Sequence, residues 1–150
     1  MQTFFNTFTG KIIRWVLLLP GAFLASTVIH FVVSIAHKVL IMFLAGMPLY
    51  DYYLEVILRE IIAGGASGYA FIIAGVIIAP HFKKYIAVIL GIQAMLICLL
   101  GLLGIGWSGY MNYNIISEFQ SWKDVFNIIA TGVGVFFAIS NVFQDENNLF

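Results

Sequence analysis

Four long apolar stretches, separated by short polar links, constrain this chain more than any other feature of its sequence. A helix needs about 20 apolar residues to cross a bilayer, so 150 residues hold four such helices with short loops. Apolar residues make up 62% of the chain and charged residues 9%, against about 25% charged in an ordinary soluble domain. So few charges cannot cover a globular surface, and disorder is excluded because it requires low hydrophobicity. We therefore expect an integral membrane protein.

The predicted fold is all-α, a single transmembrane helical domain over residues 1–150 with no separate soluble domain. Pro20 suits the first turn of the first span, and the Gly-Met-Pro run at 46–48 is a strong stop after it. Pro80 ends the second span. After a polar, aromatic loop at 107–120, Ser121 begins a capping pattern that predicts the start of the fourth span. The predicted transmembrane helices cover residues 21–45, 56–79, 85–106 and 122–143.

Residues 1–19 carry a different pattern. Apolar residues such as Phe8 and Trp15 recur at helical spacing, while Lys11 and Arg14 lie on the other face. This pattern predicts an amphipathic helix in the membrane interface that precedes the first span. A helix that simply extends the first span is the other interpretation. A cleaved signal peptide is disfavoured, because a bulky side chain would stand at the −3 position and the apolar run continues beyond it.

The distribution of charge predicts the orientation. Four spans place both termini on one face of the membrane. That face would hold Lys11, Arg14, Lys83 and Lys84. Most acidic residues lie towards the other face: Asp51, Glu55, Glu60, Glu118 and Asp124. Because positively charged loops stay on the cytoplasmic side, we expect both termini to be cytoplasmic.

Small and polar residues repeat every three or four positions in all four spans. Membrane helices associate through such residues, and an average spacing of 3.5 predicts a left-handed bundle. The simpler interpretation is that small residues are common in membrane helices. The spacing does not say whether these faces pack internally or against a partner. The residues predicted to pack are Gly64, Ser67, Gly68, Gly91, Ala94, Gly101, Thr131 and Gly134.

Ionisable residues inside a span are costly and are the first candidates for a functional site. With a neighbouring serine, the candidate site is His30, Ser34, His37, Lys38, Arg59 and Glu60. Lys38 and Glu60 would lie at one height of the first hairpin and form an ion pair, with Glu55 and Arg59 as a second pair. A charge-compensated hairpin, a proton or ion pathway, and metal or haem ligation are the three interpretations. The two histidines lie about 10 Å apart along one helix, too far to share a metal ion.

Three amide side chains also fall in or near the spans. Gln93, Asn127 and Asn141 are expected to form hydrogen bonds between helices.

No catalytic motif is present, so we expect no enzyme activity, no cofactor and no metal site. Cys98 is the only cysteine, which excludes an intramolecular disulfide. A net charge of zero and the lack of a basic stripe argue against nucleic-acid binding. The expected function is a non-catalytic subunit or scaffold of a membrane complex, in contact with the bilayer and with other membrane proteins or itself. The alternative is an oligomeric channel or proton-coupled transporter that uses the polar stripe of the first span.

Overall fold

The computed structural model describes residues 7–44, 52–111 and 115–147, and these residues form four long helices. Each helix contains an apolar stretch of at least 22 residues, with a mean hydropathy between 1.8 and 2.7. This confirms the prediction of an all-helical chain with four helices long enough to cross a bilayer. The helices are α2 (Phe8–Leu44), α3 (Tyr52–Ile78), α4 (Lys83–Met111) and α5 (Ile115–Asn147).

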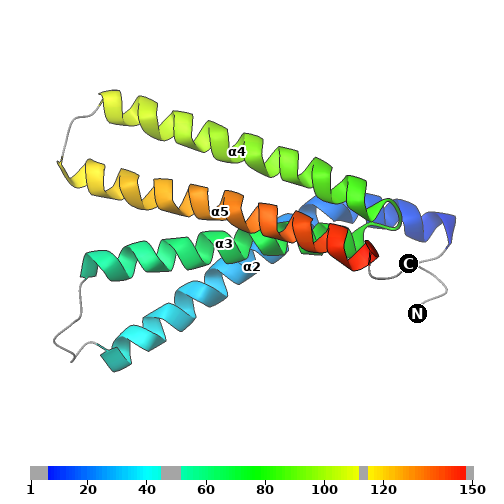
Figure 1. The fold of residues 1–150 in the computed structure, drawn as a ribbon, viewed down its shortest axis with the longest axis horizontal. Coiled ribbons are helices and arrows are strands. Elements are labelled where there is room, and N and C mark those ends of the chain that lie inside the picture. Colours follow the sequence, from blue (N-terminus) through cyan, green and yellow to red (C-terminus); the bar gives the residue numbers. More distant parts are fainter. Residues whose placement is uncertain (1–6, 45–51, 112–114, 148–150) are drawn as a thin grey trace.

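The helices run back and forth along the molecule, so that α2 begins and α5 ends at the same end (Figure 1). Helix α3 is central, because it contacts each of the other three helices. Among the described helices, α2 packs against α3 alone. Burial follows this arrangement, since 44% of the most apolar 18-residue stretch of α3 is buried but only 11% of that of α2. Helix α2 is therefore peripheral.

The apolar stretches of the last three helices agree with the predicted spans to within two residues. They cover Val56–Ile78, Lys83–Gly104 and Trp122–Gln144. The helices themselves are longer: residues 107–111 and 115–120 are helical where a loop was predicted, and Ser121 lies inside α5 and does not cap its start. Residues 112–114 of the predicted loop lie outside the described residues. Helix α4 continues to Met111, and α5 begins at Ile115 because no glycine or proline interrupts residues 115–120. The predicted stop at 46–48 lies outside the described residues.

The N-terminal segment is not a separate helix. From Phe8 onward it is continuous with the first span, through Pro20. Proline lacks the backbone N–H, so one helical hydrogen bond is lost there, and α2 changes direction along its length (Figure 1). A helix of 37 residues is about 55 Å long. That exceeds the hydrocarbon thickness of about 30 Å, so α2 is long enough to supply both a span and an interfacial segment.

Arg14 joins α2 to the end of α3. Its Nε donates a hydrogen bond to the carbonyl oxygen of Ile78 at 2.7 Å. One of its terminal nitrogens, Nη2, donates to the carbonyl oxygens of Ala79 at 3.0 Å and Ile77 at 3.1 Å. A helix leaves its last carbonyls without internal partners, and its C-terminal end attracts positive charge. The guanidinium satisfies both needs and fixes the register of α2 against α3.

Helices α3 and α5 are in backbone contact. A Cβ built on Gly64 or Gly68 would overlap the backbone carbonyl groups of Asn127 and Thr131 respectively. A Cβ on Gly134 would likewise overlap the backbone of α3. Glycine is what permits this approach, as in other closely packed membrane helices. The small residues of α3 and α5 thus lie where two helices of the same chain meet.

Helix α4 covers the other side of α5. Ala94 is buried there, Gly91 lies against Ile139, and Gly101 lies against Ile128. In this contact glycines face side chains rather than backbone. The helices are therefore farther apart than α3 and α5, and more tolerant of an added methyl group.

The backbone contact makes a testable prediction. Gly68→Ala should lower the free energy of unfolding by about 1–3 kcal/mol, because the new methyl group can be accommodated only if the helices separate. Reversible unfolding in mixed detergent micelles measures this.

The matched control is Gly104→Ala, since nothing lies within 4 Å of a Cβ at Gly104. It should leave stability unchanged or raise it slightly, because alanine favours helix. Equal effects of the two substitutions would contradict the proposed contact.

Arg14 gives a second prediction. Arg14→Ala should destabilise the fold by about 1–2 kcal/mol, because the final carbonyls of α3 lose their donors. Arg14→Lys should recover only part of the loss, since an ammonium cannot reproduce the fork of the guanidinium. Thermal unfolding in detergent distinguishes these results. The interpretation fails if Arg14→Ala matches the effect of Lys11→Ala, which removes an equal charge one turn away.

Candidate functional site

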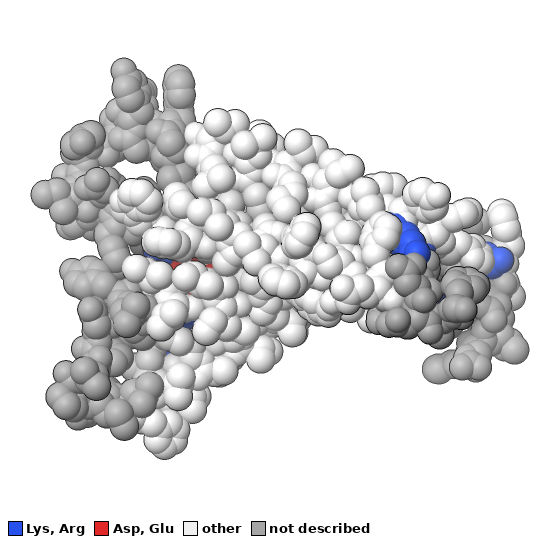
Figure 2. Space-filling view, in the orientation of Figure 1, with Lys and Arg blue, Asp and Glu red and all other residues white. Residues whose placement is uncertain are grey.

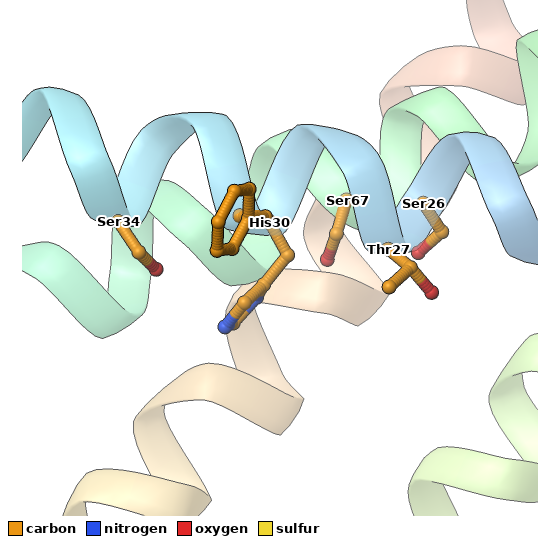
Figure 3. A pocket seen from close by; sticks show the side chains of 6 residues that line it. Ser26, Thr27, His30, Ser34 and Ser67 are labelled. Carbon is orange, nitrogen blue, oxygen red and sulfur yellow. The ribbon is translucent and has the colours of Figure 1, made fainter.

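The polar residues of the first span line a groove. The groove has a volume of about 380 Å³ and lies between α2 and α3. Helix α2 supplies Ser26, Thr27, His30, Phe31 and Ser34, and α3 supplies Ser67. The labelled polar side chains all point to the same side of α2 (Figure 3). Two of the candidate residues, His30 and Ser34, are thus brought together with Ser67, which was predicted only to pack.

The hydroxyl groups in the groove have free acceptor capacity. Thr27 Oγ1 donates to the carbonyl oxygen of Phe23 at 2.9 Å, and Ser67 Oγ donates to that of Gly64 at 2.9 Å. Each donor is thereby satisfied within its own helix, while the oxygen lone pairs remain available. Among the described residues, no side chain or backbone group forms a hydrogen bond with the His30 ring. The groove can therefore accept hydrogen bonds, and at His30 it can also donate them.

A second groove, of about 480 Å³, lies between α4 and α5 and has a different chemistry. It is lined almost entirely by apolar side chains, among them Met95, Leu99 and Phe136, together with Cys98. Acyl chains satisfy such a surface without any polar partner. The α2–α3 groove is therefore the more polar of the two.

A polar cluster joins α3 to α5 near the other end of the spans. Arg59 pairs with Glu60 at 2.6 Å, and the side chain of Glu60 is only 12% exposed. The Asn127 amide donates to Glu60 Oε2 at 2.9 Å and to the Glu60 carbonyl oxygen at 3.2 Å. A nearly buried carboxylate needs such partners. The cluster neutralises Glu60 and ties the two helices together.

The partner of Glu60 differs from the one inferred from the sequence. Lys38 is exposed and makes no ion pair with a described residue, whereas Glu60 contacts Arg59 and Asn127. The side chain of Glu60 instead contacts Asn127 of α5. Glu55 was expected to pair with Arg59, and its side chain lies outside the described residues. His37 is half-buried on the same helix as the groove residues but does not line it.

The other amides of the spans divide into two cases. Asn141 on α5 donates to the Tyr69 hydroxyl of α3 at 3.0 Å. Asn127 and Asn141 therefore form the interhelical hydrogen bonds that were predicted for them. The half-buried Gln93 on α4 forms no side-chain hydrogen bond within the described part of the chain.

Sequence reasoning missed two features of this region. Thr27 was not singled out, although a hydroxyl next to Ser26 and one turn before His30 extends the polar face. The role of Arg14 could not be read from spacing, because the carbonyls it contacts lie 63 to 65 residues further along the chain. Within the described residues, no three side chains of His, Cys, Asp or Glu come together as a metal site.

No protein-family model, curated protein or solved structure matches this chain. Its function must therefore be inferred from its own residues.

The Asn127 contacts give a prediction. Asn127→Ala should cost about 0.6–2 kcal/mol of stability, the range for a hydrogen bond between membrane helices. Asn127→Asp should cost more, because it places a second carboxylate against Glu60. The free energy of unfolding in mixed micelles measures both.

Gln93→Ala serves as the control and should have little effect, since this amide has no partner among the described residues. If Asn127→Asp were as stable as the unmodified protein, the contact with Glu60 would be disproved.

Proposed function

We propose that the chain is a multi-pass membrane protein with both termini in the cytoplasm. Each helix carries a long charge-free stretch that supports this location: residues 15–37 of α2, 61–78 of α3, 85–111 of α4 and 125–144 of α5. On the face shown in Figure 2, the charges of the described residues gather near the two ends and leave an uncharged middle. That profile suits a bilayer, in which charges avoid the hydrocarbon.

The orientation rests on the basic residues. Lys11, Arg14, Lys83 and Lys84 lie on the helices at the end where α2 begins and α4 starts. The opposite end carries the acidic residues Glu60 and Asp124 along with its basic ones. Positive charge near the ends of spans stays on the cytoplasmic side. This supports placing the end that bears the termini in the cytoplasm.

Within the membrane, we propose a non-catalytic role as a subunit or scaffold that binds another membrane protein or a second copy. The observation that carries this proposal is the peripheral position of α2, which packs against α3 alone. Its outer face presents a stripe of β-branched residues at spacings of four, three and four. These residues, Val28, Val32, Ile35 and Val39, are 46–52% exposed. We call them the valine stripe.

The valine stripe has the properties of a helix-packing surface. Its spacing is that of a heptad seam, which meets a partner helix along its whole length. β-Branched side chains have nearly fixed χ1 angles in a helix, so little conformational entropy is lost when a partner covers them. Its residues lie two positions from Ser26, His30 and Ser34 in the sequence. Two positions correspond to about 200° around a helix, so the stripe lies on the opposite side of α2 from these polar residues. A partner bound there leaves the polar groove uncovered.

A second candidate function is transport, as an oligomeric channel or a proton-coupled carrier. The polar groove favours it, because the imidazole of His30 has no hydrogen-bond partner among the described residues and an ionisable group in mid-span is costly unless it serves a polar ligand. Transport also needs an opening on the other side of the membrane. The buried side chains at the terminal end of the groove close it in this conformation.

The scaffold proposal predicts that the protein is isolated as a complex. Native mass spectrometry after gentle solubilisation should show masses above that of one chain, and this complex should be lost when Val32 and Ile35 are both replaced by tryptophan.

The matched control is the same double replacement at Leu96 and Leu99, which are similarly exposed on α4. It should leave the complex intact. A lone monomer in every mild detergent, before any substitution, would count against the proposal.

A further inference from the structure

The polar groove between α2 and α3 needs a polar occupant. In the membrane location proposed above, its side chains lie away from both aqueous phases, and lipid chains cannot form hydrogen bonds with them. Among the described residues, none supplies a partner for the His30 ring. The other lining groups, Ser26, Thr27, Ser34 and Ser67, are hydroxyls with acceptor capacity to spare. Thr27 and Ser67 already donate within their own helices, but leaving the His30 ring and the hydroxyls of Ser26 and Ser34 against hydrocarbon would cost several kcal/mol.

Water fits the groove in both size and chemistry. The volume of about 380 Å³ corresponds to about a dozen waters at about 30 Å³ each. No carboxylate is among the lining residues, so the groove lacks the negatively charged oxygen ligands that a divalent cation favours. Hydroxyl and imidazole groups instead supply the two to four hydrogen bonds that an ordered water forms.

The groove is closed at the end that bears the termini. Beyond Ser26, the buried side chains of Leu18 and Ala22 pack with Ile72 and Val76 of α3. These four residues belong to one apolar core and are at most 7% exposed. Water has no polar partner in such a core. A continuous path to that end is therefore blocked.

Towards the other end no such core closes the groove, because no residue of α2 from Ser34 to Phe43 is buried. Helices α2 and α3 diverge in that direction (Figure 1). Polar residues continue along both helices there, with the exposed Lys38 on α2 and the Arg59–Glu60 pair on α3. From Ser34 to the end of α2 at Leu44 is ten residues, or about 15 Å. Half the thickness of the hydrocarbon is also about 15 Å, so the groove reaches the middle of the membrane.

We propose that the groove is a blind aqueous half-channel that opens on the membrane face opposite the termini and ends at Ser26. It brings water, and with it protons, to His30 in mid-span from one side only. The imidazole is a group that both accepts and donates a proton. The half-channel thus gives the transport candidate an entrance, and the apolar core beyond Ser26 is its closed gate.

Accessibility of introduced cysteines tests this proposal. In a Cys98→Ser background, Ser34→Cys, Ser67→Cys and Ser26→Cys are compared with Val32→Cys and Val28→Cys. The two valine positions lie at matching heights of α2 on the opposite face and are about half exposed. Intact cells and inverted vesicles are treated with a charged, membrane-impermeant thiol reagent. The rate of labelling is followed for each side separately, and gel filtration verifies that each variant is folded.

We expect Ser34→Cys to react about tenfold faster than Val32→Cys, because the reactive thiolate forms in water and not in hydrocarbon. Ser67 is only 7% exposed, so Ser67→Cys should react more slowly than Ser34→Cys but still faster than Val32→Cys. Ser26→Cys should react more slowly than Ser34→Cys but faster than Val28→Cys. All labelling should come from the face opposite the termini. The use of two helices keeps the test valid if one variant fails to fold.

Four outcomes would overturn the proposal. Equal, slow labelling of the serine and valine positions means that a lipid chain, a partner helix or a second copy fills the groove. Labelling of Ser34→Cys from the side of the termini means a different entrance, and labelling from both sides means a through pore. Fast labelling of the valine positions as well would show that α2 is not in the membrane. That last result refutes the proposed location, whereas the other three results leave it standing.

Discussion

The backbone contact between α3 and α5 determines how the rest of the molecule is arranged. Gly64 and Gly68 let α3 approach α5 until the carbonyls of Asn127 and Thr131 occupy the space of their absent side chains. Helices α3 and α5 run in the same direction, so α4, which connects them in the sequence, runs in the opposite direction. Because α3 and α5 are in direct contact, α4 packs on the far side of α5. One side of α3 is left for α2. A bundle in which consecutive helices packed equally would have covered α2 on two sides instead.

The same close approach makes the Glu60 cluster possible. Asn127 meets Gly64 through its backbone carbonyl and reaches Glu60 through its amide, one turn earlier on α3. A larger residue at Gly64 would move the amide away from the carboxylate. The close approach of α3 and α5 and the hydrogen bond between Asn127 and Glu60 therefore depend on each other. This coupling explains how α3 holds a nearly buried carboxylate inside a span, where charge is otherwise costly.

The sequence predicts what is local and periodic, and it misses what depends on the choice of neighbour. Apolar runs locate the last three spans to within two residues but miss the start of the first apolar stretch, which reaches back to Phe8. Glycine spacing points to Gly64, Gly68 and Gly134, which lie where α3 and α5 meet. The spacing of residues does not show that α3 packs more closely against α5 than against α2 or α4. For this reason the sequence pairs Glu60 with Lys38 of α2. It also places Arg14 at the membrane interface and not against the end of α3. The helical ends beyond the spans were missed for a related reason. Polar and aromatic residues at 107–111 and 115–120 resemble a loop, although nothing there prevents helix.

The peripheral position of α2 lets one helix present two unlike surfaces. Its polar face opens into the groove beside α3, and its valine stripe faces the opposite way, so a partner and a water column need not compete for the same residues. The two surfaces also share a mechanical constraint. Helix α2 is held to α3 by Arg14 and by the buried contacts of Leu18 and Ala22, all at the end that bears the termini. Towards Leu44 the two helices diverge, and less contact opposes their relative movement there. A partner on the valine stripe would therefore act where α2 is least constrained, and would alter the width of the groove from its open end.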